Sequence, residues 1–416
     1  ITVARPVFHE GRLVAWAGSV AHSPDIGGRV RSADATSVYE EGFQIPPMKV
    51  MHAGVIDKTL ERLLRQNVRV PDQVMGDLFA QFTGLALIER QIHALMREYK
   101  LQTLDALSRE LRGRSERAMR NAIGALREGT YTAEATSDGF DTPIRLRMAM
   151  TVRGDSLEID CAGSDLQVQK SINVCLAYTT AYTAYGIKAV LCPEVPNNDG
   201  TLAPLTITAP RGSILNSTPP APGGARALIG HFLPAMVLNV MAQVVPDKVI
   251  AGVGSPIWCV NIAGVQPNGK GFANLFFLNG GYGASAQGDG ANVLSWPSNI
   301  SSTPVEVIEQ IAPLKVHRRQ FRKIKSANGR HRGGTGQEIL LESLAENPAT
   351  MSFMAERTRP ESAAPGLHGG EPGAPGEIEI DGKRVNPKQQ HTIVKGSRIL
   401  LRTPGGAGFG DPKERR

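Results

Sequence analysis

The segment DGFDTPIRLRMAMTVRGDSLEID, residues 138–160, decides the fold class of this chain. From Ile144 to Val152 every second residue is apolar, and residues 153–156 then form a turn signal before a second alternating stretch. A period of two is typical of strands that bury one face. The segment therefore predicts an antiparallel strand meander.

The chain before this segment has a helical period. Between Pro46 and about Glu128, apolar residues recur every three or four positions, as in Met75, Leu78, Phe79, Phe82, Leu85 and Ile88. This spacing places them on one face of a helix. We expect further helices over 169–191 and 226–245, and a β-hairpin at the start of the chain, over residues 1–17.

The chain after the meander mixes strands with turns. Strands are expected over 201–216 and from Ile257 to about Gly290, and the last 90 residues combine short strands with Gly/Pro turns. Together these patterns predict an α+β fold, a large multi-layer glycine-rich unit with a helical segment at about 46–128 and mixed β-sheet regions. We expect four segments: a metal-motif hairpin and loop (1–45), a helical region (46–135), an α/β core (136–300) and a C-terminal β-rich region (301–416).

The net charge comes from one short segment. The 416 residues include 46 basic and 39 acidic ones, a formal charge of +7, but eight of the basic residues and no acid lie between Gln310 and Gly333. Without those eight the charge is −1 (38 basic against 39 acidic residues). We therefore expect a solvated face or a subunit contact there, and no nucleic-acid partner. The alternative is a basic arm that binds a polyanion.

Two other patterns narrow the function. Residues 264–271 resemble a P-loop, but Gly271 replaces the final Ser/Thr and a strand follows, so Asn268-Gly269 predicts a hairpin turn instead. The four cysteines form no CxxC pair, which favours buried free thiols and a cytoplasmic location. No apolar stretch is long enough to span a membrane, so we expect no membrane partner.

The segment His22-Ser-Pro-Asp25-Ile-Gly27-Gly28 is the strongest candidate for chemistry. A neutral imidazole is the commonest metal ligand, and a nearby carboxylate such as Asp25 could orient it. The alternative is a structural histidine. Glu41, in the acidic pair before Gly42, could contribute to such a site or belong to a surface turn.

Several blocks resemble the B-type chain of the hydantoinase/oxoprolinase family. They begin with the His22 segment and continue as Glu40-Glu-Gly-Phe-Gln-Ile-Pro-Pro, Ile159-Asp-Cys-Ala-Gly-Ser, Pro219-Pro-Ala-Pro with Arg226, Gly280-Gly-Tyr-Gly, Arg330-His-Arg-Gly-Gly-Thr-Gly and Thr403-Pro-Gly-Gly-Ala-Gly-Phe-Gly-Asp-Pro. The resemblance covers essentially the whole chain in the expected order. It implies a heteromeric enzyme that contains a hydantoinase A-type, ATP-binding subunit.

The resemblance also implies roles for particular residues. It suggests Asp25 and Glu41 as catalytic residues, and Gly27, Gly28, Arg226 and Arg332 as substrate contacts. It implies His22 as a ligand of a divalent metal, Zn²⁺ or Mn²⁺, while ATP and Mg²⁺ act through the partner subunit. In the family a Gly-Thr-His-x-x-Asp stretch with two more ligands precedes the opening strand, so the resemblance places those ligands before Ile1.

Three functions follow as hypotheses. The first is a metal-bearing subunit of an ATP-dependent cyclic-amide hydrolase, in which the partner phosphorylates a small-molecule substrate. The second is a subunit of an ATP-dependent ketone carboxylase of the acetone/acetophenone type. The third is a nucleic-acid or scaffold protein that uses the basic segment.

Overall fold

The computed structural model describes residues 1–415, and contacts divide the chain into two compact units. The smaller unit consists of Ile1–Gly28, Gly42–Arg117 and Pro196–Ala203. The larger unit consists of Arg29–Glu41, Ala118–Val195 and the chain from Pro204 onward. The four segments expected from the sequence remain a proposal beside this division.

The smaller unit packs a β-hairpin on a long helix. Strands β1 (Thr2–His9) and β2 (Arg12–Val20) are antiparallel, and both turn residues between them, Glu10 and Gly11, have positive φ. This conformation matches the twist of a hairpin and confirms the predicted start of the chain. Buried side chains of the hairpin share one apolar core with helix α2 (Pro71–Glu98).

The predicted helical region is confirmed with one difference. Its helices are α1 (Lys58–Asn67), α2 and α3 (Asp105–Gly124), and a short α5 (Asp199–Leu202) joins the smaller unit from later in the chain. Residues 46–57 are not helical, and two short strands form there, β3 (Met51–His52) and β4 (Val55–Ile56). The Asp57 carboxylate accepts the Leu60 N–H at 2.9 Å, so this N-cap sets where α1 begins.

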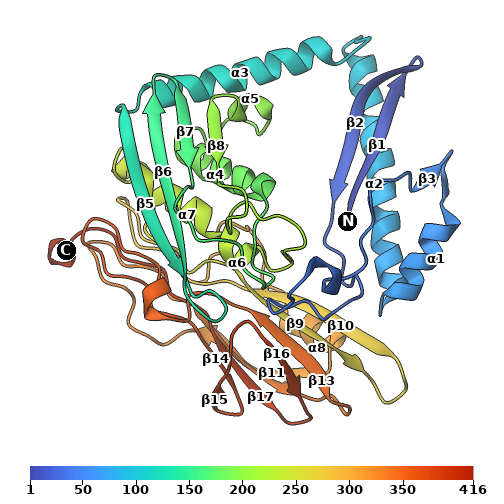
Figure 1. The fold of residues 1–416 in the computed structure, drawn as a ribbon. Helices are drawn as coiled ribbons and strands as arrows, with labels where there is room; N and C mark the ends of the chain where they lie inside the picture. Colours follow the sequence, from blue (N-terminus) through green and yellow to red (C-terminus); the bar gives the residue numbers. More distant parts are fainter. Residues whose placement is uncertain (416) are drawn as a thin grey trace. The chain divides into compact units, whose positions relative to one another are not determined.

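The segment that decides the fold class forms the first sheet of the larger unit (Figure 1). Its strands, in spatial order, are β5 (Gly129–Ser137), β6 (Ile144–Arg153), β7 (Ser156–Asp160) and β8 (Leu205–Thr208). The alternating residues of β6 are all buried, which confirms the predicted meander, while β7 and β8 pair in parallel. Helices α4 (Leu176–Leu191) and α7 (Phe232–Met241) pack with this sheet in one apolar core.

The helix predicted over 226–245 is interrupted at His231. It forms α6 (Ala227–Gly230) and α7, and a 3₁₀ turn (Pro246–Lys248) follows. The interruption has a simple cause, since an unbroken helix would need an N–H from Pro234 to the Gly230 carbonyl and proline has none. Proline is tolerated in the first turn of a new helix, where Pro234 lies.

Two more antiparallel sheets complete the larger unit and share a second core. One has the order β10 (Gly271–Leu278), β9 (Trp258–Val265), β13 (Ala349–Met354) and β16 (Gln390–Ile393). The other has the order β11 (Leu314–Phe321), β12 (Gln337–Ser343), β17 (Arg398–Arg402), β14 (Glu377–Ile380) and β15 (Lys383–Arg384), with α8 (Val305–Ile311) before it. Residues 264–271 are the turn of the β9–β10 hairpin, which confirms the hairpin and not the P-loop.

Glycine-rich segments without regular secondary structure form a further part of the larger unit. This glycine-rich cluster comprises residues 280–291, 333–336 and 404–410. Its segments exchange backbone hydrogen bonds, such as Gly334 N–H to the Tyr282 carbonyl and Gly406 N–H to the Gly334 carbonyl, both 2.8 Å. A Cβ at Gly334 would lie 1.9 Å from the Ala291 carbonyl oxygen, so only glycine allows this approach.

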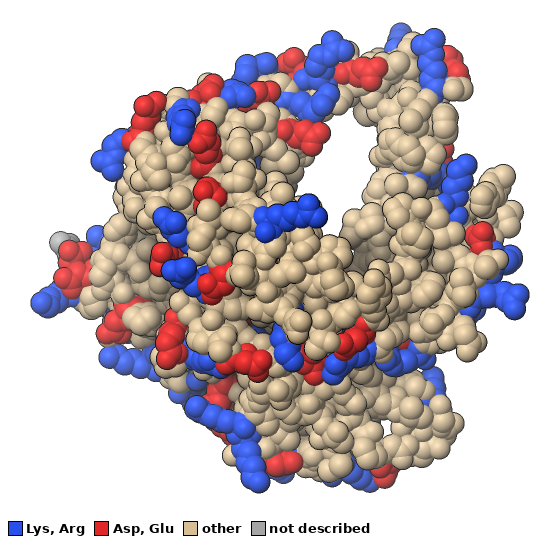
Figure 2. Space-filling view, in the orientation of Figure 1, with Lys and Arg blue, Asp and Glu red and all other residues tan. Residues whose placement is uncertain are grey.

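The basic segment is largely engaged within the chain. Arg318 pairs with Glu338 at 2.7 Å, and Arg322 donates to two backbone carbonyls. Basic and acidic side chains are interspersed over the face of the molecule in Figure 2. The segment is therefore part of the sheet around β11 and β12 and does not form a free basic arm.

Two other sequence expectations can be compared with the structure. All four cysteines are free thiols, as predicted, but Cys175 is exposed because it lies at the N-cap of α4, where the prediction was a buried side chain. Among residues 1–415, no helix is both long and apolar enough to cross a membrane.

Candidate functional site

The His22 segment forms a loop of the smaller unit, directly after β2. His22 is exposed, whereas the Asp25 carboxylate is buried. Asp25 accepts hydrogen bonds from the Arg69 guanidinium at 2.6 Å, from the Arg69 backbone N–H and from the Gly27 N–H at 3.1 Å. This ion pair fixes the loop to the segment between α1 and α2.

The two glycines of the loop allow a close backbone approach. A Cβ at Gly27, whose φ is +74°, would lie 2.4 Å from the Asn67 carbonyl oxygen. The Gly28 carbonyl accepts a hydrogen bond from Arg69. These contacts account for both glycines by packing, and their predicted role as substrate contacts stays a prediction.

The described residues do not fit a metal centre by themselves. Within residues 1–415, no three His, Cys, Asp or Glu side chains gather closely enough to hold an ion. A protein metal site needs at least three such ligands. His22 as a metal ligand stays a prediction, and we derive no catalytic step through a metal.

Glu41 organises a loop in the larger unit. Its carboxylate accepts hydrogen bonds from the Gly224 N–H at 2.6 Å, the Gly223 N–H at 3.2 Å and the Ser171 hydroxyl. Arg31 holds the other side of the same loop, because its guanidinium donates to the Gly224 carbonyl at 2.8 Å. We call residues 223–226 the Arg226 loop.

The Arg226 guanidinium lies over an aromatic stack. Its central carbon is 5.3 Å from the Tyr178 ring centroid, within the range of a cation–π interaction. Tyr178 and Tyr182 stack with centroids 4.2 Å apart, and Tyr182 stacks on His231 at 5.2 Å. The tyrosines are one helical turn apart on α4, and His231 lies at the junction of α6 and α7.

The aromatic stack of Tyr178, Tyr182 and His231 offers Arg226 no counter-charge. Burial, with a smaller contribution from the nearby Arg226 charge, lowers the pKa of His231 to about 3. Burial raises the pKa of Tyr178 above its usual value. At neutral pH the only charge in this group is therefore the Arg226 guanidinium.

A cation on a neutral, partly buried surface is suited to binding anions. Guanidinium groups bind phosphate and carboxylate oxygens through paired N–H donors, and such bonds gain strength where water is excluded. The Arg226 loop could thus hold a phosphate group, or the negative charge that develops on an oxygen during acyl transfer.

Arg332 lies next to the glycine-rich cluster. Its side chain is exposed, and its backbone N–H donates to Asp289 at 2.7 Å. The same carboxylate pairs with Arg415 at 3.0 Å, and this hydrogen-bonded pair lowers the pKa of Asp289. The predicted contact of Arg332 with substrate is not tested by these interactions.

The structure thus joins some predicted residues and adds others. It brings Glu41 and Arg226 to one loop, and it brings Asp25, Gly27 and Gly28 to another. Arg31, Ser171 and the aromatic stack were missed by the sequence reasoning. Only the tyrosine spacing of four in a helical segment could have indicated a shared face.

Comparisons with known proteins agree with the resemblance. The sequence profile of the hydantoinase B/oxoprolinase family matches residues 1–412. A protein from Pseudomonas sp. (strain NS671), proposed to be the B-type subunit of a D-/L-hydantoinase, is 33% identical over 99% of this chain and 73% of its own length. The beta chain of caprolactamase from Pseudomonas jessenii is 27% identical over 99% of this chain and 74% of its own length.

A solved structure of acetone carboxylase without nucleotide has the same fold. It superposes with a TM-score of 0.87 at 20% identity, covering all of this chain and 63% of the carboxylase chain. This likeness confirms the predicted α+β fold. The profile match and the homologous enzymes show that the chain is an enzyme chain of the hydantoinase B/oxoprolinase family.

Proposed function

We propose that this chain is the B-type subunit of an ATP-dependent cyclic-amide hydrolase of the hydantoinase/oxoprolinase type. The observation that supports this most is the whole-chain similarity to the B-type chain of a hydantoinase and the beta chain of a caprolactamase, which exceeds the similarity to the acetone carboxylase. Both relatives are named as subunits, which supports a hetero-oligomer with an ATP-binding, A-type partner. The P-loop-like segment of this chain is a hairpin, so ATP and Mg²⁺ are assigned to the partner.

The chemistry of the proposed reaction balances as follows. The γ-phosphoryl group of ATP is transferred to the amide oxygen of the ring, and ADP leaves. Water adds to the activated carbon, the ring C–N bond breaks, and the nitrogen takes up a proton, which leaves an acyl phosphate. A second water attacks the same carbon, and phosphate departs with the original amide oxygen, so that a carboxylate remains.

Arg226 is the residue of this chain best suited to the phosphorylated intermediate. In the proposal its guanidinium binds the phosphate oxygens against the neutral aromatic stack. Glu41 and Arg31 hold the loop in shape through the backbone of Gly223 and Gly224. Gly27, Gly28 and Arg332 remain proposed substrate contacts.

His22 remains the proposed ligand of a divalent metal, Zn²⁺ or Mn²⁺. A bound divalent metal would lower the pKa of water and polarise a carbonyl. Asp25, in the same loop, is the proposed orienting residue, since its carboxylate is fixed by Arg69. Four free thiols support the further proposal that the chain works in the reducing cytoplasm.

A substrate panel tests the function. The full-length protein, purified together with its A-type partner, is given ATP and Mg²⁺ with hydantoin, 5-oxoproline or caprolactam, or with acetone and bicarbonate. We expect ADP release that depends on one of the cyclic amides. ADP release that depends on ketone and bicarbonate, with none of the amides active, would instead establish the carboxylase.

A further inference from the structure

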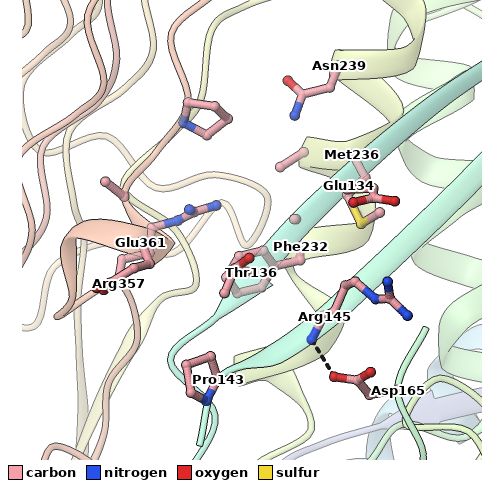
Figure 3. A pocket seen from close by; sticks show the side chains of 14 residues that line it. Glu134, Thr136, Pro143, Arg145, Asp165, Phe232, Met236, Asn239, Arg357 and Glu361 are labelled. Carbon is pink, nitrogen blue, oxygen red and sulfur yellow. Dashed lines mark hydrogen bonds between the residues drawn. The ribbon is translucent and has the colours of Figure 1, made fainter. Parts of the chain in front are cut away.

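A pocket of about 440 Å³ lies in the larger unit, and the proposed reaction does not use it (Figure 3). Its walls come from β5, the start of β6, α7 and the loop of residues 357–365. Apolar side chains of Phe232, Ala235 and Met236 form one wall, and charged side chains lie around it. This volume is within the range of pockets that hold small molecules.

Arg357 is the most unusual residue of this pocket. It is 2% exposed, and its φ is +59°, a left-handed conformation that a long side chain rarely adopts. Its guanidinium carbon lies 4.4 Å from the Phe232 ring centroid, and burial lowers its pKa to about 10. Figure 3 shows this guanidinium extending toward the middle of the pocket.

A buried ionic network holds Arg357 in this conformation from both sides. On one side Glu356 pairs with Lys388 at 2.9 Å, and both side chains are essentially inaccessible to water. On the other side Thr358 donates its N–H and its hydroxyl to the Asp138 carboxylate, at 2.8 Å and 2.9 Å. A strained residue persists only where its surroundings determine it this fully, and such residues cluster at binding sites.

The guanidinium keeps one donor group for a ligand. Nε donates to the Ser255 carbonyl and Nη1 to the Ser362 carbonyl. Among residues 1–415, no acceptor lies within hydrogen-bond distance of Nη2. A buried guanidinium with a spare terminal nitrogen is suited to a carboxylate oxygen, because charge-assisted hydrogen bonds are the strong ones.

The opposite wall offers the complementary charge. Glu134, on β5, lies across the pocket from Arg357 (Figure 3), and its exposed carboxylate is 4.0 Å from Arg147. Asn239 extends into the space above them (Figure 3). A cation on one side, an acid on the other and an apolar wall between them match a molecule with a carboxylate, a short carbon chain and an ammonium group.

We propose that this pocket binds a small amino acid, with its carboxylate on Arg357 and its ammonium group on Glu134. Ring-opened cyclic amides of the caprolactam and oxoproline kind belong to this chemical class. This link to a reaction product rests on the proposed function, whereas the binding itself does not.

The test is a binding titration with 5-aminopentanoate on the full-length protein together with its partner, without ATP. We expect saturable binding, at least about tenfold weaker in Arg357→Lys, which keeps the charge but loses the planar fork. Glu134→Gln, an exposed change that leaves the buried network intact, should weaken binding about threefold. The control Glu194→Gln and the variant Arg226→Gln, at the other site, should leave it unchanged.

Three results would overturn the assignment. One is the absence of saturable binding in the wild type. Another is pentanoate, which has no ammonium group, binding as tightly as 5-aminopentanoate. The third is Glu134→Gln binding like the wild type. Cyclic-amide-dependent ADP release is measured separately, so loss of this inference leaves the proposed function standing, and loss of that activity leaves the binding result intact.

Discussion

Glu41 and Asp25 show that a carboxylate in a family motif can act through the backbone it holds. Glu41 accepts two backbone N–H groups and a hydroxyl, and Asp25 accepts two N–H groups and a guanidinium. Carboxylates with their lone pairs so occupied are suited to fixing loops. The geometry therefore supports positioning roles for both, and substitution can separate these from the predicted catalytic roles.

Replacing Glu41 by Gln should loosen the Arg226 loop. An amide nitrogen cannot accept the Gly223 or Gly224 N–H, so we expect a loss of about 1–3 kcal/mol in stability, together with weaker substrate binding. Denaturant unfolding and KM measure these effects, and Glu40→Gln, whose side chain contacts Arg29 and Thr36 instead, is the matched control. If Glu41 instead transfers a proton, stability will be unchanged while kcat falls and its pH profile loses one limb.

His231 should make the protein sensitive to acid. Its pKa is about 3 when folded and near 6.5 when unfolded, so between these values the unfolded chain binds one more proton. Stability is therefore lost as the pH falls below about 6.5, by about 1.4 kcal/mol per pH unit from this group. His231→Phe keeps the stacking on Tyr182 and should remove this slope in unfolding curves between pH 6 and 4, whereas parallel pH profiles would refute the assignment.

His22 can be tested by metal content alone. In the full-length protein with its partner, we expect His22→Ala to lower the bound Zn²⁺ or Mn²⁺ substantially, since removing one ligand of three or four weakens a site strongly. Elemental analysis measures this without an activity assay. His52→Ala, an exposed histidine of the same unit, is the control. Full occupancy in His22→Ala would end the ligand assignment.

At the scale of elements, the glycine-rich cluster should be the part least tolerant of substitution. Gly334→Ala would place a Cβ 1.9 Å from a backbone oxygen, so we expect a loss of about 3 kcal/mol in unfolding free energy. Gly288→Ala is the control, because nothing lies within 4 Å of its Cβ position and its φ is not positive. It should change stability by less than about 1 kcal/mol. Equal effects of the two substitutions would contradict the close packing.

The elements also show what the sequence could and could not predict. The meander at 144–160, the opening hairpin and the helices around α2 follow from local periodicity, which reports which face is buried. The break at His231 depends on one missing proline N–H inside an apolar stretch, which periodicity does not register. The junction of Glu41 with Ser171 and Gly224 joins residues 130 or more positions apart, and no local pattern encodes such a contact.

At the scale of the whole chain, the charge and the similarity to relatives point the same way. Basic groups of the 315–332 segment are neutralised or hydrogen-bonded within the larger unit, as Arg318, Arg319 and Arg322 show. The match to the family runs from residue 1 to residue 412. Both observations favour a chain of a heteromeric enzyme over a polyanion-binding protein.

The transfer of the ring oxygen tests the central claim most directly. A cyclic amide labelled with ¹⁸O in its carbonyl is turned over by the full-length protein with its partner and ATP, and the released phosphate is examined by mass spectrometry. Because the amide oxygen is the atom phosphorylated and leaves when water attacks carbon, the phosphate should carry the label. Unlabelled phosphate, with all of the ¹⁸O retained in the product carboxylate, would contradict the account.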